Sequence, residues 1–426
     1  MHDSFSRRDF LATSATLGAA ALSGGRSVAS AAEPDPKGKL RVAAVNSVYW
    51  FKSHAYHIEG RILDGYRREG VHHQPQLKLV RMFNDQYPPT DLSRELCQAR
   101  GVELCSSIAE ALGGGAGAAG PLDVDAVLLI CEHGDYKQNE LGQILYPRYE
   151  MFERIVEVFR KSKRSVPVFV DKHLSYDHRK AAKMVATARE LKFPLMAGSS
   201  LPVTWRRPEL EPALETPFRE GLSIFGFDPA RAEIYLFHAL EALQCMWERR
   251  KGGETGIAKV RCLAGPAVWK AADDGAWSWK LLDAALARCP SRNVGSVKEN
   301  VRNPQAVLIE YRDGTRATVL NLMEQVSELA FAATVDGQAE PTSTCFILPP
   351  PPGAKFFDPL TWHIERFFTT GKPPYPIERT LLTTTICDLA LQSLHAGGKE
   401  IANPALDIRY AAPADSGFFR GRYTDA

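Results

Sequence analysis

Short apolar runs of strand length alternate with helical patterns between residues 40 and 200. The apolar runs cover residues 40–45, 77–83, 101–104, 123–130, 166–170 and 194–198. The run at 123–130 is apolar towards both faces, which is typical of an interior strand of a parallel sheet. Strands that alternate with helices in this way predict a parallel, doubly wound sheet. Residues 40–200 are therefore limited to an α/β domain.

Residues 201–410 show a different pattern, in which several strand-like stretches follow one another closely. These stretches are 257–263, 306–311, 315–323 and 328–335. The Asp313-Gly314 pair between two of them is a hairpin signal. Helical patterns at 230–249, 358–370 and 377–396 flank them. We expect an α+β domain on an open, largely antiparallel sheet, followed by a tail at 411–426.

The N-terminus has the features of a twin-arginine signal peptide. Ser-Arg-Arg-Asp-Phe-Leu at 6–11 is followed by a mildly apolar stretch and by Ala-Ser-Ala at 29–31. The sequence predicts a signal peptide at 1–31, a leader at 32–39, and a bacterial protein that is periplasmic or otherwise exported by this route. The apolar stretch is too short for a membrane span, and none is expected later in the chain.

Composition excludes several classes of partner. The formal net charge is +2 and basic residues are not clustered, which argues against nucleic acid. The eight cysteines include no C-x-x-C pair, so they predict no zinc site. Most of them should be buried, and the sequence allows one or two disulfides. His54 and His57 are three residues apart, a spacing too loose to predict a metal site.

The turn after the first strand, residues 46–51, contains no glycine. In a doubly wound sheet this turn ordinarily holds the pyrophosphate of a dinucleotide, and glycines let the backbone approach it. Here Val48, Tyr49 and Trp50 carry side chains where the pyrophosphate needs room. Whether this turn still holds a cofactor largely decides what the protein does.

Candidate site residues follow the strands, where parallel sheets bind ligands. Asp85 ends the second strand, His133 follows the run at 123–130, and Lys172 follows the run at 166–170. His238 and Glu241 lie three apart, hence on one helix face, where they could share a proton relay. Each residue also has a purely structural interpretation, as a turn residue, a loop lysine or a packed histidine.

The order of these elements resembles the glucose-fructose oxidoreductase, inositol dehydrogenase and MocA (Gfo/Idh/MocA) family over nearly all of the chain after residue 31. The segments that carry the resemblance are 124–133, 170–173, 237–241 and 362–374. It implies a Rossmann domain, an α/β domain with an open sheet, and hydride transfer between NAD or NADP and a sugar or polyol. A homodimer or homotetramer is also implied. The chain departs from the family at 171–173, which reads Asp-Lys-His for Glu-Lys-Pro, and at Glu241, which replaces an aspartate.

The resemblance assigns roles to individual residues. The catalytic set is Lys172, His238 and Glu241; the cofactor-binding set is Asn46, Ser47, Val48, Asp85, Cys131, Glu132 and His133. We expect an exported NAD(P)-dependent oxidoreductase that acts on a carbohydrate or polyol. Because the glycines are missing, the alternative is a non-catalytic or cofactor-independent descendant that binds a sugar, or one that catalyses elimination on it.

Overall fold

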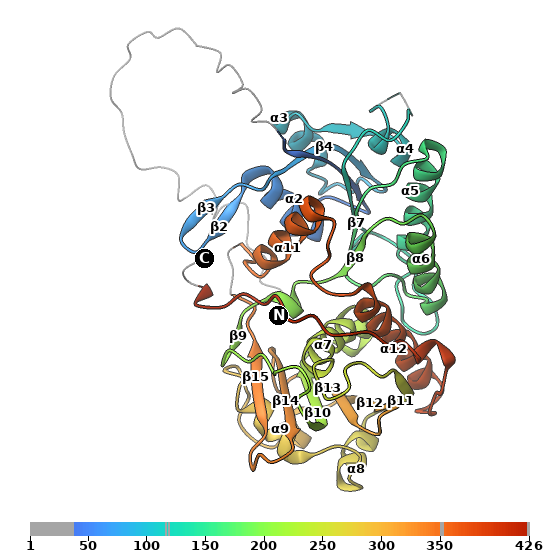
Figure 1. The fold of residues 1–426 in the computed structure, drawn as a ribbon. Helices are drawn as coiled ribbons and strands as arrows, with labels where there is room; N and C mark the ends of the chain where they lie inside the picture. The colour runs from blue at the N-terminus through green and yellow to red at the C-terminus, as the bar shows by residue number, and fades with distance from the viewer. Residues whose placement is uncertain (1–37, 116, 118–119, 350–352, 424–426) are drawn as a thin grey trace. The chain divides into compact units, whose positions relative to one another are not determined.

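The computed structural model describes residues 38–423, apart from 116, 118–119 and 350–352 (Figure 1). The predicted signal peptide at 1–31 and the leader up to residue 37 lie outside the described residues. The described residues from Lys39 onwards form one compact unit. Within its described part, no helix is both long and apolar enough to cross a bilayer.

The first sheet has six strands in the order β5-β4-β1-β6-β7-β8, and every neighbouring pair is parallel. Its strands are β1 (Leu40–Asn46), β4 (Leu77–Asn84), β5 (Glu103–Cys105), β6 (Ala126–Ile130), β7 (Val168–Asp171) and β8 (Leu195–Gly198). Sequence order reverses between β1 and β6, which is the switch point of a doubly wound sheet. The prediction for residues 40–200 is confirmed.

Helices cover both faces of this sheet because its side chains alternate in direction. Ala43 and Val45 of β1 face a core with α4 (Ile108–Leu112), α5 (Arg148–Ser162) and α6 (His178–Glu190). Val42 and Ala44 face the opposite core, with α2 (His54–Asp64) and α3 (Ser93–Arg100). A small hairpin, β2 (Tyr66–Arg68) and β3 (Val71–His73), follows α2.

The second sheet has seven strands in the order β11-β12-β13-β10-β14-β15-β9. They are β9 (Arg206–Arg207), β10 (Phe218–Phe225), β11 (Ile257–Ala264), β12 (Gln305–Tyr311), β13 (Arg316–Asn321), β14 (Leu329–Val335) and β15 (Thr342–Phe346). Only β10 and β13 pair in parallel. The expected largely antiparallel sheet is confirmed.

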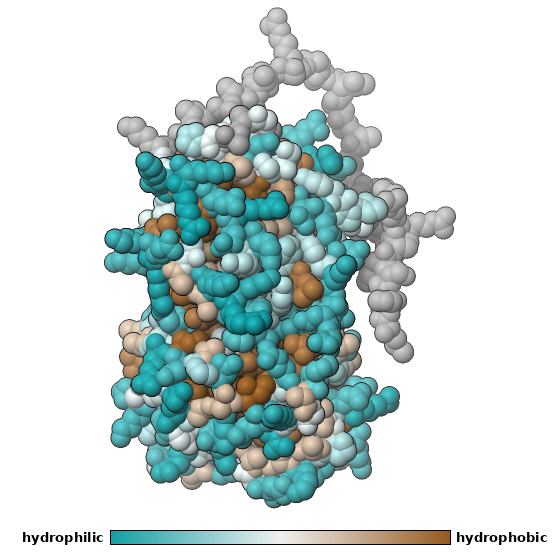
Figure 2. Space-filling view, turned by 90° about the vertical axis from the view of Figure 1, so that its right-hand side faces the viewer, coloured by the Kyte–Doolittle hydropathy of each residue, from teal (hydrophilic) through white to brown (hydrophobic). Residues whose placement is uncertain are grey.

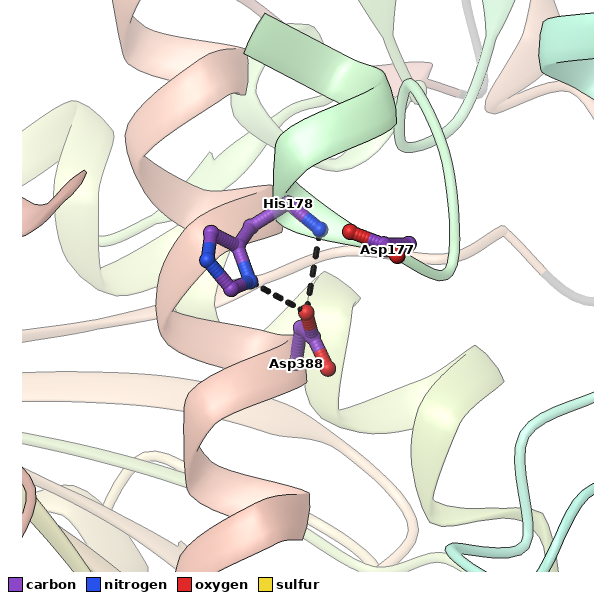
Figure 3. A group of neighbouring side chains, drawn as sticks. All are labelled: Asp177, His178 and Asp388. Carbon is purple, nitrogen blue, oxygen red and sulfur yellow. Dashed lines mark hydrogen bonds and ion pairs between the residues drawn. The ribbon is translucent and has the colours of Figure 1, made fainter.

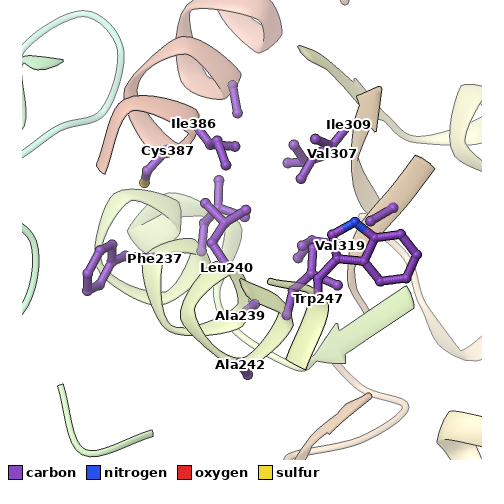
Figure 4. Close-up of a cluster of buried hydrophobic side chains, with 14 of the residues drawn as sticks. Phe237, Ala239, Leu240, Ala242, Trp247, Val307, Ile309, Val319, Ile386 and Cys387 are labelled. Atoms are coloured by element: carbon purple, nitrogen blue, oxygen red, sulfur yellow. The ribbon is translucent and has the colours of Figure 1, made fainter. Parts of the chain in front are cut away.

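Helices lie on both faces of the second sheet as well. On one face, α7 (Ala232–Trp247) packs on β10, β13 and β14, and α12 (Ile377–His395) packs on β11. Figure 4 shows Leu240 and Ile386 between the two helices, with Val307 and Val319 of the strands beside them. On the other face lie α8 (Pro266–Asp273) and α9 (Trp279–Leu286), which sequence patterns did not predict. A short α10 (Val297–Asn300) follows. The homodimer or homotetramer stays a prediction.

Helix α11 (Phe357–Thr370) returns to the first sheet although it comes late in the sequence. Phe357, Leu360 and Ile364 belong to the same core as Val42 and Ala44. The first core is therefore built from two distant parts of the chain, and the boundary at residue 200 stays a prediction.

Two remaining features are the cysteines and the face of the molecule that carries α5 and α6. All eight cysteines are buried and free, so the one or two disulfides that the sequence allowed are not formed. Figure 2 shows a mainly hydrophilic surface on the side of α5 and α6, with apolar residues in scattered spots.

Candidate functional site

A chain of buried charged groups lies at the carboxyl ends of β6 and β7. Lys172 Nζ donates to Glu132 Oε1 at 2.8 Å, and Arg148 Nη2 donates to Glu132 Oε2 at 2.5 Å. All three side chains are at most 3% exposed. Burial alone would raise the pKa of Glu132, but the charges of Lys172 and Arg148 hold it well below its usual range. Glu132 is therefore an anion that fixes both cations.

The charged chain continues to the second domain. His173 Nε2 lies 3.1 Å from Arg148 Nη1 and 2.5 Å from Glu233 Oε1 on α7. This network of buried side chains connects the end of the first sheet to helix α7, which packs on the second. Within it, Lys172 is held by Glu132 rather than by water.

Two loop residues at the strand ends have left-handed backbones. The φ angles of His133 and Lys172 are 74° and 64°, in the region that favours glycine. Such conformations cost about 1–3 kcal/mol each and concentrate at functional sites. The backbone N–H of Lys172 donates to Gly198 O at 3.0 Å, which helps to hold this geometry.

His238 and Glu241 meet Ser199, which follows β8. Ser199 donates its backbone N–H to Glu241 Oε1 at 2.9 Å and its hydroxyl to Glu241 Oε2 at 2.5 Å. His238 Nδ1 lies 3.0 Å from the same hydroxyl and 3.4 Å from Glu241 Oε2. The ring is thus oriented through Nδ1, and no bond to Nε2 is found within the described residues.

The protonation of this pair follows from its surroundings. Burial, followed by the nearby Lys172 and His54, holds the pKa of His238 well below its usual range. Burial also raises the pKa of Glu241 to about 7. His238 is therefore a neutral imidazole at pH 7, able to accept a proton at Nε2.

A second histidine enters the site from α2. His54 Nδ1 pairs with Asp171 Oδ2 at 2.7 Å, and Asp171 is fully buried. The His54 ring lies edge-on to His133 with 5.4 Å between centroids. A carboxylate that holds one imidazole nitrogen leaves the other directed outwards, as in a hydrolase triad. Sequence reasoning weighed His54 only for a metal, and it overlooked Arg148, His173, Ser199 and Glu233, for which no local sequence signal exists.

The residues expected to bind a cofactor mostly serve the turn itself. Asn46 donates to Asn84 Oδ1 at 3.1 Å, Ser47 donates to Glu132 O at 2.9 Å, and Val48 is 1% exposed. Cys131 is buried, and Asp85 accepts a hydrogen bond from Tyr136 at 2.8 Å.

The loop after β4 closes over this turn. Asp85 N donates to Asn46 O, Gln86 N donates to Ser47 O, and Leu92 N donates to Tyr49 O, at 2.9–3.0 Å. Three carbonyl groups of the turn thus accept hydrogen bonds from the backbone of this loop.

The start of α2 does not fit a dinucleotide. A pyrophosphate needs open N–H groups at the N-terminus of the helix. Ser53, the N-cap, and Ala55 are at most 1% exposed. The side chain between them, His54, reaches across to Asp171. No step of a mechanism is therefore drawn through NAD or NADP at this turn.

The residues that could hold a metal are not free to do so. Asp177, His178 and Asp388 place ligand atoms within 4.8 Å of one another (Figure 3). However, Arg179 donates to both carboxylate oxygens of Asp177, while His178 and Gln392 donate to Asp388. This group caps α6 and joins it to α12.

Comparison with solved structures bears on the fold. GenD2 from gentamicin A biosynthesis, solved with NAD, matches with a TM-score of 0.52 and 14% identity, covering 87% of this chain and 99% of that one. Myo-inositol 2-dehydrogenase from Lactobacillus plantarum matches with a TM-score of 0.52 and 12% identity, covering 85% and 99%.

The protein has the fold of the Gfo/Idh/MocA-type dehydrogenases.

A third match with this fold is the WlbA dehydrogenase from Bordetella pertussis, solved with NADH and UDP-GlcNAcA. Its TM-score is 0.50 at 13% identity, covering 87% of this chain and 99% of that one. Sequence comparison finds no matching family model and no matching curated protein. At these identities the likeness establishes the Gfo/Idh/MocA fold alone. The reaction has to be inferred from the residues of this chain.

Proposed function

We propose that this protein catalyses an elimination on a carbohydrate that carries a carbonyl or carboxylate group, without a dinucleotide at the β1–α2 turn. The observation that carries the proposal is the His54–Asp171 pair. It puts an oriented imidazole at the start of α2, where a Gfo/Idh/MocA-type dehydrogenase would hold its cofactor. The chain's own residues then supply acid, base and cation.

Each of the three groups has a role in elimination. Neutral His238 removes a proton from a carbon next to a carbonyl or carboxylate group, through Nε2. Lys172, fixed by Glu132, stabilises the oxygen that gains negative charge. His54 protonates the departing oxygen. One C–H bond and one C–O bond break, a C=C bond forms, and the alcohol or water leaves with the proton of His54.

Ser199 and Glu241 act as positioning residues for His238. Both oxygens of Glu241 are engaged by Ser199, whose hydroxyl also faces His238 Nδ1. This arrangement fixes the ring plane and leaves Nε2 for the substrate.

The test is turnover of uronate-containing oligosaccharides by the purified protein without added nucleotide. Elimination creates a C=C bond conjugated with the carboxylate, which absorbs at short ultraviolet wavelengths. We expect His238→Gln and Lys172→Met to abolish the signal, and Arg154→Ser, an exposed control on α5, to leave it unchanged. A strict requirement for NAD or NADP would overturn the proposal, as would a dissociation constant for either nucleotide tighter than about 1 mM.

A second candidate function is NAD(P)-dependent hydride transfer on a sugar or polyol. The shared fold of GenD2 with NAD and of WlbA with NADH favours it, as does the position of Lys172 after β7. It requires the loop at 84–92 to leave the turn before nucleotide can bind. Calorimetry with each nucleotide separates the two candidates, and a protein that binds sugars without any turnover would match neither.

Export through the twin-arginine route is part of the proposal. The Ser-Arg-Arg-Asp-Phe-Leu stretch at 6–11 supports it. We expect the full chain to reach the periplasm of a bacterial host, and the double variant Arg7→Lys and Arg8→Lys to remain in the cytoplasm. Equal fractionation of both forms would contradict export by this route.

A further inference from the structure

A large cavity lies away from the residues described above, between the hairpin β2–β3, helix α11 and the C-terminal tail. Its volume is about 1010 Å³. Small-molecule sites usually measure about 300–1,000 Å³, so this cavity has room for more than one sugar ring. None of Lys172, His238 and His54 lines it.

The tail that forms one wall is held by specific contacts. Phe419 N donates to Val203 O at 2.9 Å, Gly421 N donates to Glu209 Oε1 at 2.6 Å, and His363 Nε2 lies 2.6 Å from Gly417 O. Residues 415–422 therefore form a defined wall of the cavity.

The cavity is lined by cations from three separate segments of the chain. They are Arg68, Arg366, Lys372, Arg420 and Arg422, against the carboxylates Glu69 and Asp415. The whole protein carries a formal net charge of only +2, so positive charge is concentrated here. In the described part of the chain, no carboxylate lies within 4.0 Å of Arg366, Lys372 or Arg422.

Aromatic rings hold the arginines in place. The guanidinium of Arg68 lies 3.5 Å from the centroid of Trp362, and that of Arg420 lies 4.3 Å from the centroid of Phe418. Both arginines also pair with carboxylates of this chain: Arg420 Nη2 lies 2.6 Å from Glu211 Oε2, and Arg68 Nη2 lies 3.4 Å from Glu69 Oε1. The cations left to bind an incoming carboxylate are therefore Arg366, Lys372 and Arg422.

We propose that this cavity binds an acidic oligosaccharide, a chain of sugars that carry carboxylate groups. The cations come from several segments rather than from one point, which suits anionic groups repeated along a chain better than a single phosphate. Because Arg68 covers one face of Trp362, the ring is less open to a stacked nucleobase. The site would hold a polymer at the surface, and its existence does not depend on the chemistry proposed for His238.

The test is calorimetric titration of the purified protein with α-1,4-linked tetragalacturonate. Cellotetraose is the neutral comparison, and inorganic phosphate and a short oligo(dT) are the other anions. We expect tetragalacturonate to bind, with an affinity that falls as salt is raised. The double variant Arg366→Ser/Lys372→Ser should weaken it at least about tenfold, a loss of about 1.4 kcal/mol.

A matched control removes the same charge elsewhere. Arg154→Ser/Lys161→Ser takes two exposed cations from α5 and should bind tetragalacturonate like the wild type. Equal losses in the two double variants would show an effect of net charge and overturn the site. Binding of cellotetraose as tight as that of tetragalacturonate would also overturn it, as would binding of oligo(dT) or phosphate alone. Melting temperatures of both variants identify any loss of fold.

Discussion

Replacing Glu132 with glutamine tests whether the buried charge network holds the site together. Glu132 accepts from Lys172 at 2.8 Å and from Arg148 at 2.5 Å, and none of the three is more than 3% exposed. Glutamine keeps the shape but removes the charge, so two buried cations lose their anion. Breaking a buried ion pair costs about 3–5 kcal/mol. The remaining amide oxygen can still accept one bond, so we expect a loss near the lower end, about 3 kcal/mol.

The measurement is urea unfolding at pH 7, with the denaturant slope compared between variants to confirm a two-state transition. Glu310→Gln is the control, because Glu310 also pairs with a lysine, at 3.2 Å, but is exposed. It should show no measurable change. The double variant Glu132→Gln/Lys172→Met should lose less than the sum of the two single variants, since the charge left behind is also removed.

The pH dependence gives the same network a second signature. The folded-state pKa of Glu132 is held well below its usual range, whereas in the unfolded chain it is about 4.3. Its stabilising effect is therefore fully present above about pH 4.3 and is lost as pH falls towards the folded value. The wild-type and Glu132→Gln curves should converge in acid. A loss below about 1 kcal/mol at pH 7, or a gap that stays constant into acid, would refute the reasoning.

Three further predictions concern other residues. Burial raises the pKa of Glu59 in α2 to about 8. At pH 7 the folded protein therefore binds a proton at Glu59 that the unfolded chain does not hold, and this uptake costs stability. Glu59→Gln should raise the unfolding free energy by about 3 kcal/mol at pH 7, and this gain should vanish near pH 4.5. At Gly198, with φ +139°, an added Cβ would lie 2.6 Å from Tyr375 Oη and 3.0 Å from Glu241 Oε1, so Gly198→Ala should clearly lower the melting temperature. The control is Gly314→Ala, which has open space around it and should lose only the stability that its backbone strain costs. Millimolar zinc should leave the melting temperature unchanged, because Asp177 and Asp388 are already bonded; a rise that Asp388→Asn removes would show a metal site there.

Much of the first sheet and of the site's location was predictable because both follow from local patterns. The apolar runs and the helices between them specify a doubly wound sheet, and its carboxyl edge follows from chain direction alone. Lys172 and His133 were therefore identified as candidates without a structure, and His238 was identified by its three-residue spacing to Glu241. The glycine-free turn at 46–51 likewise indicated that a pyrophosphate would lack room.

The helices on the outer face of the second sheet were harder to predict. Helices α8 and α9 are eight residues each, so their periodicity is weak. Only their packing in the structure, α9 on β10 and β14 and α8 on β11, shows their role. The packing of α11 on the first core was missed for a different reason. The sequence of α11 shows that one of its faces is apolar, but it does not show which sheet that face packs against.

The sequence by itself determined the alternation of strands and helices, the strand ends that carry candidate site residues, and the absence of glycine from the turn at 46–51, because each is encoded by neighbouring residues. Only the tertiary structure decided that His54 pairs with Asp171, 117 positions away, and that Ser199 joins His238 to Glu241. The same holds for the loop at 84–92, which closes the turn, and for the tail that completes the basic cavity. These contacts depend on where distant segments pack, and packing is set by the whole core rather than by any local pattern.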